Sequence, residues 1–482
     1  MKIAFLQDTV NQNIGLMYIS AIVKSQGYEC ALFINSLEED LVQAVSHFRP
    51  DIVGFSVITG SHNWALNTAR RVKEAVPRAL VIFGGPHPTY FPDIVNDPAV
   101  DVVARGEAEV SFPDFVNRIS EGKDYSDISG LWVKKGVNVF RNDIQRLVED
   151  LSSLPYPDHS LYLKYNFFRN QTEVPFSTTR GCPYRCSFCY NHVKAALYRG
   201  KGRYVRTRKV DEIIGEMKEA VKLYRNMRSI ILYDDIIGID KKWLSDFSDA
   251  YSGEVGLPWF TSIRADLVDE FIADKLAKAN CFCLSLGLES GDESLREEVL
   301  GKKILDMQYV KAAELLHNAG IKVRTSNMFF LPGEDISKAL KTVDLNRRIK
   351  ADFAWAYTLQ PYPGTVIYDY SVKNGYLSGS FQFDDIDPLG LLEPIINLRD
   401  GKKILVLHRL FHYAVHYRPV RKLMKLFLLI PPNPLFDWLY YLSLILSYAK
   451  YHQVSIARAF KIAWDNYRGT KKNYRCAHQV AD

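Results

Sequence analysis

Three cysteines lie within eight residues of one another in the segment TTRGCPYRCSFCYN, at positions Cys182, Cys186 and Cys189. A structural zinc site normally needs four protein ligands, commonly in two separated pairs, and no second pair at a suitable spacing follows. Cys281 and Cys283 alternate in CFCLSLGLES, so we expect both on one face of a buried strand. Three thiolates can instead hold three irons of a 4Fe-4S cluster and leave the fourth iron open to another ligand. The spacing therefore predicts a reactive cluster rather than a structural metal site.

The residues that follow the cysteines alternate between strand and helix patterns. Amphipathic stretches such as VDEIIGEMKEAVKLYR and DEFIADKLAKA separate apolar runs such as SIILYDDII, FCLSLGLES and FAWAYTLQPYPG. About six such units over residues 175–375 predict a partial (β/α)6 barrel of parallel strands. Functional groups in such barrels gather at the carboxyl ends of the strands. The polar side chains near predicted strand ends are Asp234, Asp235, Arg264, Glu289 and Gln360.

Residues 1–145 follow a strand–helix alternation of their own. KIAFLQD, CALFI, DIVGFSVIT and ALVIFGG have the pattern of nearly continuous apolar strands, with helical segments between them. Such strands are typical of a doubly wound parallel sheet, which binds ligands beyond the carboxyl ends of its strands. The fingerprint G-x-G-x-x-G is absent after the first strand, so NAD or FAD is not expected. We predict a Rossmann-like α/β domain here, followed by a linker over residues 146–174.

The cysteine spacing, with the aromatic residue Phe188 just before the third cysteine, resembles the signature of the radical S-adenosyl-L-methionine (radical SAM) superfamily. In that family the amino and carboxylate groups of SAM chelate the open iron, and an electron from the cluster releases a 5′-deoxyadenosyl radical. The resemblance implies that Glu289 in GLESG lies near the SAM ribose and that FLPGE, residues 330–334, lies near the adenine.

The same resemblance implies a contact of Arg264 and the two adjacent aspartates with the methionyl end of SAM, although LYDDIIG stands where the family's GGE triplet is expected. The implied SAM contacts are Phe188, Tyr190, Asp234, Asp235, Arg264, Glu289 and Gln360. For each of them a structural salt bridge or a strand-end cap is the alternative.

Three stretches of the first domain, GFSVITG (54–60), FGGPHPT (83–89) and ARGEAE (104–109), resemble the cobalamin-binding domain that often precedes a radical SAM barrel. Small residues there would let the backbone approach a flat macrocycle. The implied cobalamin contacts are Asn13, Gly15, Ser56, Thr59, Gly84, Gly85, Arg105 and Glu107. The alternative is a domain that has lost its ligand and serves as a scaffold.

Many cobalamin proteins carry an Asp-x-His-x-x-Gly loop whose histidine ligates cobalt. Counting back from Gly15, this chain has Val10 and Gln12 at the Asp and His positions. The resemblance therefore implies that cobalamin binds base-off and His-off. His62, after the third strand, is a candidate for the lower side of cobalt, with a polar surface residue as the alternative.

Residues 376–482 form a basic, aromatic and mainly helical region. Residues 401–482 contain 14 Lys and Arg against three acidic residues, a net charge of about +11 on a chain whose total is +6. His408, His412 and His416 recur every four residues and share one helix face, which fits packing or substrate contact, with a metal site as the alternative.

The segment RKLMKLFLLIPPNPLFDWLYYLSLILSYAKY in this region has apolar runs that PPNP and Asp437 interrupt. These runs are shorter than the roughly 20 residues needed to span a bilayer. Aromatic residues with flanking cations are typical of a helix at a membrane surface, and helices packed on the barrel with a basic outer face are the alternative. Nucleic acid is a weaker candidate for the basic surface, because its cations are interleaved with long aliphatic runs.

The composition is that of a globular protein, with 47% apolar residues over a length of 482. No signal peptide is expected at the start, so we expect reduced thiols and a cytoplasmic protein, with peripheral contact at the inner face of the membrane if the tail binds lipid.

Residues 1–375 together resemble cobalamin-dependent radical SAM enzymes, which include class B methylases and related oxidative cyclases. The leading prediction is a methyltransferase that acts on an unactivated carbon of a small or hydrophobic, lipid-like substrate, with a flavodoxin- or ferredoxin-type electron donor. A radical cyclase or rearrangement enzyme without net methyl transfer is the second prediction. A non-enzymatic cobalamin- or lipid-binding protein is the third.

Overall fold

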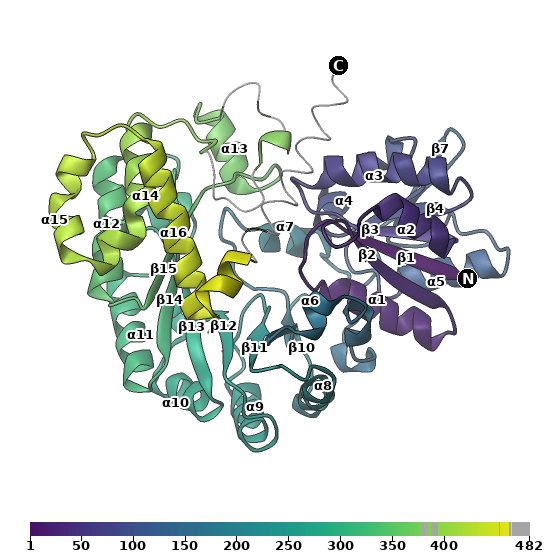
Figure 1. The fold of residues 1–482 in the computed structure, drawn as a ribbon, viewed down its shortest axis with the longest axis horizontal. Coiled ribbons are helices and arrows are strands. Elements are labelled where there is room, and N and C mark those ends of the chain that lie inside the picture. The colour runs from purple at the N-terminus through teal and green to yellow at the C-terminus, as the bar shows by residue number, and fades with distance from the viewer. Residues whose placement is uncertain (378–380, 382, 387–393, 453, 462–463, 465–482) are drawn as a thin grey trace.

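The first domain is a seven-stranded sheet with helices on both faces (Figure 1). The computed structural model describes residues 1–377, 381, 383–386, 394–452, 454–461 and 464. The strand order is β2-β1-β3-β4-β5-β6-β7, and β1 to β5 pair in parallel. The strands are β1 Lys2–Gln7, β2 Glu29–Ile34, β3 Ile52–Ser56, β4 Leu80–Gly84, β5 Val102–Ala104, β6 Leu131–Lys135 and β7 Asn138–Arg141. The helices are α1 Ile14–Ser25, α2 Leu41–Phe48, α3 His62–Ala75, α4 Pro86–Tyr90 and α5 Ser111–Ser120.

The strands of this sheet are apolar on both faces because helices cover both. Ile3 and Phe5 of β1 pack in one core with α1 and α5, while Ala4 and Leu6 pack in a second core with α2 and α3. This alternation confirms the predicted doubly wound sheet. The sheet is extended by β6 and β7, which pair antiparallel and turn at Gly136 with φ +60.

The second sheet has six strands in the order β15-β14-β13-β12-β11-β8, and every neighbouring pair is parallel. Its strands are β8 Glu173–Phe176, β11 Ser229–Leu232, β12 Trp259–Ile263, β13 Cys281–Glu289, β14 Lys322–Phe329 and β15 Phe353–Thr358. Its covering helices are α8 Val210–Leu223, α9 Lys241–Glu254, α10 Glu270–Lys278, α11 Asp306–Asn318 and α12 Ile336–Arg348. The predicted partial barrel of about six parallel units is thereby confirmed.

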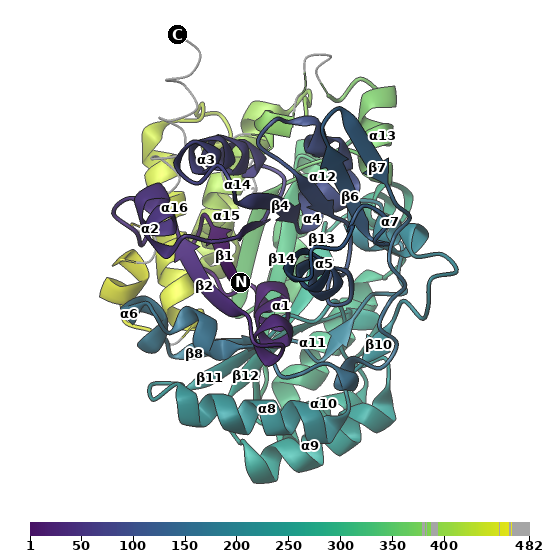
Figure 2. The ribbon, with the colours of Figure 1, turned by 90° about the vertical axis from the view of Figure 1, so that its right-hand side faces the viewer.

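Residues 146–174, predicted as a linker, pack against the first domain. Tyr162, Tyr165 and Phe168 join the core that contains α1 and α5. The Tyr162 hydroxyl donates a hydrogen bond to Gln7 Oε1 over 2.8 Å. The first domain lies in front of the strands of the second sheet in the view of Figure 2, and beside them in Figure 1.

The described part of the C-terminal region is mainly helical, as predicted. Helix α13 Val366–Lys373 precedes this region, whose helices are α14 Gly401–His416, α15 Arg418–Phe427 and α16 Pro434–Tyr451. Helix α14 contacts α12, α15, α16 and β15. Among the described residues, the structure contains no helix whose length and apolar character would suit it to crossing a bilayer.

Helix α16 packs on the barrel along one face, which supports the packed-helix prediction for that face. Its last residue, Tyr451, lies inside the half-barrel against Phe260 of β12 and Phe353 of β15, with ring centroids 5.0 and 5.4 Å away. His452 Nδ1 lies 2.9 Å from Glu173 Oε2 on β8. The end of α16 therefore links the two edge strands of the open sheet.

The three histidines of α14 lie on one face, as predicted, and that face packs against α16 and β15. His408 Nε2 lies 3.2 Å from the carbonyl oxygen of Ala356, and His412 Nδ1 lies 3.3 Å from Ser447 Oγ. Burial lowers the pKa of His408 to about 3 and of His412 to about 4, so both are neutral. Within the described part of the chain, no three His, Cys, Asp or Glu side chains converge on a position for one metal ion. Packing against α16 and β15 therefore accounts for the three histidines on one face of α14.

Candidate active site

The three cysteines lie on a loop that follows β8, at the carboxyl edge of the second sheet. Two short strands, β9 (Thr179–Arg180) and β10 (Arg206–Thr207), pair antiparallel and hold the two ends of this loop together. Gly181 begins the loop with φ +87, and a Cβ atom there would lie 2.3 Å from the carbonyl oxygen of Tyr204. Only glycine fits this position without a backbone shift.

Two aspartates after β11 fasten the start of the loop. Asp234 Oδ1 accepts hydrogen bonds from the amides of Thr178 and Thr179, over 2.6 and 2.9 Å. Asp235 accepts from the amide of Gly181 over 2.7 Å and from Asn191 Nδ2 over 3.0 Å. Burial raises the pKa of Asp234 to about 6 despite these hydrogen bonds. Both carboxylates, which the resemblance implies at the methionyl end of SAM, thus accept hydrogen bonds from the cysteine loop in this structure.

The middle of the loop is fixed from the opposite side. The Ser187 amide donates to the carbonyl of Leu300 over 2.9 Å, and its hydroxyl donates to the carbonyl of Val299 over 2.6 Å. The amide of Ile367, on α13, donates to the Ser187 carbonyl over 3.1 Å. Each of these contacts has a backbone amide or carbonyl as its partner, so side-chain spacing in the sequence could not reveal them.

The cysteines themselves are half-buried free thiols. The amide of Asn191 lies 3.5 Å from Cys189 Sγ, and its Nδ2 lies 3.7 Å away. Burial raises the pKa of all three thiols, so a bound metal must supply the positive charge that favours the thiolates. Three thiol donors on one preformed loop fit a 4Fe-4S cluster with one open iron.

Arg264, at the end of β12, contacts the cysteine loop through an aromatic ring. Its guanidinium carbon lies 3.6 Å from the ring centroid of Tyr184, a residue between the first two cysteines. Its Nε and Nη2 donate to the two carboxylate oxygens of Asp266 over 3.0 and 2.8 Å. Arg264, which the sequence predicts near a strand end, therefore lies beside the cysteine loop.

Glu289 ends β13 in a strained conformation, with a left-handed φ of 65. Its Oε1 lies 3.1 Å from Nζ of Lys302, and both side chains are buried. Sequence reasoning missed Lys302, because one lysine after a glycine has no pattern that signals burial. Its positive charge also lowers the pKa of Cys186, against the larger effect of burial.

The remaining predicted SAM contacts lie around the same edge. Phe188 packs against the barrel core. Tyr190 stacks on Tyr90 of the first domain, with centroids 4.1 Å apart, and donates to the carbonyl of Pro363 over 2.7 Å. Gln360 Nε2, after β15, donates to Thr358 Oγ1 over 3.1 Å.

The carboxyl edge of the first sheet brings together most of the predicted cobalamin contacts. The residues at or near the ends of elements there are Asn13, Gly15, Ser56, Thr59, Gly84 and Gly85. Asn13 caps α1 and its Nδ2 donates to Ser56 Oγ over 2.7 Å. Gly85 has φ +96, and a Cβ atom there would lie 2.9 Å from the amide nitrogen of Val57. This close backbone approach requires glycine whether or not a ligand is bound.

A stacked pair of histidines lies at this edge. His62 and His87 have ring centroids 4.5 Å apart, and His87 Nδ1 lies 3.0 Å from Thr59 Oγ1. Burial lowers the pKa of His87 to about 3, so its ring is neutral. Phe383 meets both rings edge-on, with centroids 6.1 and 5.7 Å away. Sequence reasoning selected His62 and the stretch around His87 but did not identify the pair.

The two remaining predicted cobalamin contacts, Arg105 and Glu107, have partners within the protein. The Arg105 guanidinium lies 5.1 Å from the ring of Trp132 on β6. Glu107 forms ion pairs with Arg206 over 2.5 Å and with Arg180 over 3.1 Å, at the base of the cysteine loop. Glu107 therefore joins the two domains, and the carboxyl edges of the two sheets face one another.

Two family models match this chain. Residues 8–116 match the B12 binding domain, and residues 176–345 match the Radical SAM superfamily. An uncharacterized methyltransferase of Pyrococcus horikoshii is 27% identical over 380 residues, which are 77% of this chain and 80% of that protein. A cytidylyl-2-hydroxyethylphosphonate methyltransferase of Streptomyces wedmorensis is 22% identical over 83% of this chain and 85% of its own. An anaerobic magnesium-protoporphyrin IX monomethyl ester cyclase of Rubrivivax gelatinosus is 27% identical over 72% and 64%.

Solved structures share the fold. The cobalamin-dependent S-adenosylmethionine radical enzyme OxsB, with aqua-cobalamin bound, superposes with a TM-score of 0.70 at 14% identity, over 99% of this chain and 80% of its own. The radical S-adenosylmethionine methyltransferase TsrM from Kitasatospora setae, with cobalamin and its cluster bound, gives a TM-score of 0.65 at 17% identity, over 82% of each chain. The overall fold of this chain therefore recurs in these enzymes.

Proposed function

This chain is a radical SAM protein with a B12-binding domain, and on that premise we propose that it is a cobalamin-dependent methyltransferase that methylates an unactivated carbon of a small or hydrophobic substrate. The observation that carries the proposal is the three-cysteine loop at the carboxyl edge of one sheet, facing the carboxyl edge of the other. Relatives named as methyltransferases that match across most of both chains support methyl transfer.

Each cofactor has a set of residues suited to hold it. Cys182, Cys186 and Cys189 would hold the 4Fe-4S cluster. Glu289, Gln360 and Arg264 are the strand-end groups that would contact SAM, with Phe188 and Tyr190 beside them. Asn13, Gly15, Ser56, Thr59, Gly84 and Gly85 would line the cobalamin site. When bound, the cluster with SAM would supply a carbon-centred radical, and cobalamin would supply the methyl group.

Aromatic side chains of this chain pack where the two domains meet. Tyr90 of the first domain stacks on Tyr190, which directly follows the third cysteine. Phe383 covers the histidine pair and also packs on Phe91, with centroids 4.5 Å apart. Excluding water protects reactive intermediates from side reactions. The neutral His87 adds no charge beside them.

Base-off, His-off binding of cobalamin is supported by the position that the loop histidine would occupy. Gln12 stands there, and its Nε2 donates to the Tyr224 hydroxyl over 2.7 Å. Its Oε1 accepts from Gln171 Nε2 over 2.7 Å. These hydrogen bonds hold the Gln12 side chain against Tyr224 and Gln171, and glutamine has no imidazole that could ligate cobalt. A one-electron donor of flavodoxin or ferredoxin type belongs to the same proposal.

The test is anaerobic reconstitution of the full chain with iron, sulfide and hydroxocobalamin, followed by desalting. Reduction in the presence of SAM is then followed by quantification of 5′-deoxyadenosine and S-adenosylhomocysteine. The Cys186→Ala variant should lose the cluster and 5′-deoxyadenosine, whereas Cys30→Ala, on β2 away from the site, should retain both.

The products separate the candidate functions. Retained corrinoid with both SAM products supports the methyltransferase. Retained corrinoid with 5′-deoxyadenosine but no S-adenosylhomocysteine favours the cyclase, for which the Rubrivivax gelatinosus relative is the supporting observation. A cluster without retained corrinoid contradicts the cobalamin part of the proposal. Unchanged activity in Cys186→Ala would contradict the radical part.

A further inference from the structure

An exposed apolar surface lies where α15 passes into α16, at the edge of the molecule away from the first domain (Figure 1). We call it the α15–α16 surface, and its residues are Leu423, Leu426, Leu429, Ile430, Leu435 and Trp438. Leu429 is 78% exposed, and Leu426 and Trp438 are 60% and 59% exposed. Only Met424 of α15 is fully buried, so this helix presents most of its length to the outside.

Cations flank the apolar residues of the α15–α16 surface. Arg418, Lys422 and Lys425 are exposed on α15, beside Leu423 and Leu426. None of the three forms an ion pair with another residue that the structure describes. Exposed leucines beside uncompensated cations are the composition of a helix that lies at an anionic lipid surface.

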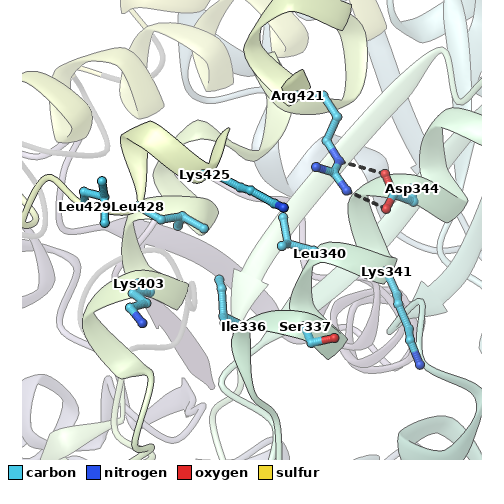
Figure 3. A pocket seen from close by; sticks show the side chains of 10 residues that line it. All are labelled: Ile336, Ser337, Leu340, Lys341, Asp344, Lys403, Arg421, Lys425, Leu428 and Leu429. Atoms are coloured by element: carbon cyan, nitrogen blue, oxygen red, sulfur yellow. Dashed lines mark hydrogen bonds and ion pairs between the residues drawn. The ribbon is translucent and has the colours of Figure 1, made fainter. Parts of the chain in front are cut away.

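A cavity of about 490 Å³ opens beside this surface, between α12, α14 and α15. Its lining residues are Ile336, Ser337, Leu340, Lys341, Asp344, Lys403, Arg421, Lys425, Leu428 and Leu429. Figure 3 shows Lys425 extending from α15 toward Leu340, while Arg421 points at Asp344.

The charges around the cavity are only partly compensated. Arg421 donates to both carboxylate oxygens of Asp344, over 2.7 Å each, and Lys341 lies 2.7 Å from Asp292. Lys403 has only a loose contact of 3.8 Å with Asp400. Lys425 and Lys403 are therefore available to an anion, and Leu428 and Leu429 provide an apolar wall beside it.

We propose that the α15–α16 surface docks on an anionic lipid bilayer, with its leucines and Trp438 in the interface and a lipid phosphate at the cavity of Lys425 and Lys403. Apolar burial and attraction to anionic headgroups both favour this contact. Docking does not depend on the methyl transfer proposed above, because it is measured without cofactors or turnover.

Other occupants of the surface fit less well. A second copy in a two-fold contact would bring the same cations of α15 against themselves. Residues 465–482 of this chain carry Arg468, Lys471, Lys472 and Arg475, so their charge has the same sign as the surface. Nucleic acid would satisfy the cations but would leave the exposed leucines in water.

The test is co-sedimentation of the full chain with phosphatidylcholine vesicles, with and without phosphatidylglycerol. Wild type should bind the anionic vesicles and bind the neutral ones much more weakly. The double variant Leu426→Ser/Leu429→Ser should weaken binding at least about tenfold, because two exposed leucines no longer enter the interface. Lys425→Ala should weaken it about fivefold on anionic vesicles alone.

Matched controls lie on α8 and α9, which cover the second sheet and contribute no residue to the α15–α16 surface. Leu223→Ser replaces an exposed leucine at the end of α8, and Lys242→Ala removes an exposed cation of α9. Both should bind as wild type does. Brominated lipids should quench wild-type fluorescence more than that of Trp438→Phe, which locates the contact independently of affinity.

Several outcomes would overturn the proposal. One is a wild type that stays in the supernatant with anionic vesicles. Another is binding that both surface variants retain in full. A dimer in sedimentation velocity that Leu426→Ser/Leu429→Ser abolishes would assign the surface to a second copy instead. Tighter binding to a DNA duplex than to anionic vesicles, lost in Lys425→Ala, would assign it to nucleic acid.

Discussion

The carboxylate of Glu107 and the guanidinium of Arg206 form an ion pair, 2.5 Å between Oε1 and Nη2, that joins the first domain to the base of the cysteine loop. The Arg206 side chain is 1% exposed and that of Glu107 is 9% exposed. Burial alone would raise the pKa of Glu107, but the hydrogen bond from Arg206 and the charge of Arg180 hold it below its ordinary value. The position of the loop relative to the first domain thus depends on a buried charge.

Replacing this carboxylate should destabilise the protein. Glu107→Gln leaves the Arg206 charge without its carboxylate partner, which costs about 3–5 kcal/mol for a buried pair, whereas Arg180 keeps its ion pair with Glu109. Urea unfolding should show this loss, with the two domains unfolding at separate midpoints. Glu121→Gln, an exposed carboxylate of the same domain, should change the free energy of unfolding by less than about 0.5 kcal/mol. Equal losses in the two variants would show that Glu107 does not join the domains.

Alanine substitutions at two glycines of the cysteine loop should distinguish a clash of the new Cβ atom from the strain of a left-handed backbone. Gly181 and Gly200 both have positive φ, at +87 and +74, but only Gly181 has a backbone oxygen where a Cβ would go. Gly200→Ala should lower the free energy of unfolding by about 1–2 kcal/mol, because alanine is strained at this φ. This variant should still bind iron after reconstitution. Gly181→Ala should shift the loop and lose most of its iron and sulfide after reconstitution. Full iron in both variants would contradict a preformed loop.

The buried Glu334 predicts a particular dependence of stability on pH. Burial raises its pKa to about 8, and its Oε1 has no hydrogen-bond partner within the described residues. A carboxyl group whose folded pKa is raised stabilises the folded state below its unfolded pKa of about 4.5, and that stabilisation is lost as pH rises through 8. Wild-type Tm should therefore fall between pH 6 and pH 9 more than that of Glu334→Gln.

The exposed Glu314 on α11 supplies the control for this measurement. Glu314→Gln should keep the wild-type dependence on pH. The same slope in Glu334→Gln as in wild type would show that Glu334 is ionised in the folded protein.

Helix α16 should contribute to stability through its last turn. Tyr451 is 1% exposed inside the half-barrel, so Tyr451→Ala should cost about 3–5 kcal/mol in urea unfolding, as for other large aromatic truncations. Tyr441→Ala removes an exposed tyrosine of the same helix and should cost much less. If both variants unfold at the same midpoint, the end of α16 does not fill the barrel.

Element types and the cysteine site could be predicted because each has a local signature. The alternation of Ile3, Ala4, Phe5 and Leu6 between two cores is a run of apolar residues, which predicts a strand buried on both faces. The three cysteines have a spacing that itself specifies their chemistry.

The orientations of single charged side chains could not be predicted, because their partners are distant in sequence. Glu107 lies 99 residues from Arg206, and nothing in ARGEAE indicates that it points to the barrel. Lys302 becomes a partner of Glu289 only once the chain turns at Gly301. Asp234 was correctly placed at a strand end, but which backbone amides it would meet depended on the fold.

The contact between Glu173 and His452 joins residues that are 279 positions apart in the chain. β8 is the first strand of its sheet to be synthesised, and the residue that links it to β15 follows all the other strands. Until then the emerging chain exposes an open apolar barrel interior, at the stage where partly folded proteins aggregate. Such a distant contact also slows folding, because a long loop must close first. We therefore expect soluble production of this protein to depend on chaperones and slow synthesis, although its strands follow one another in a regular order.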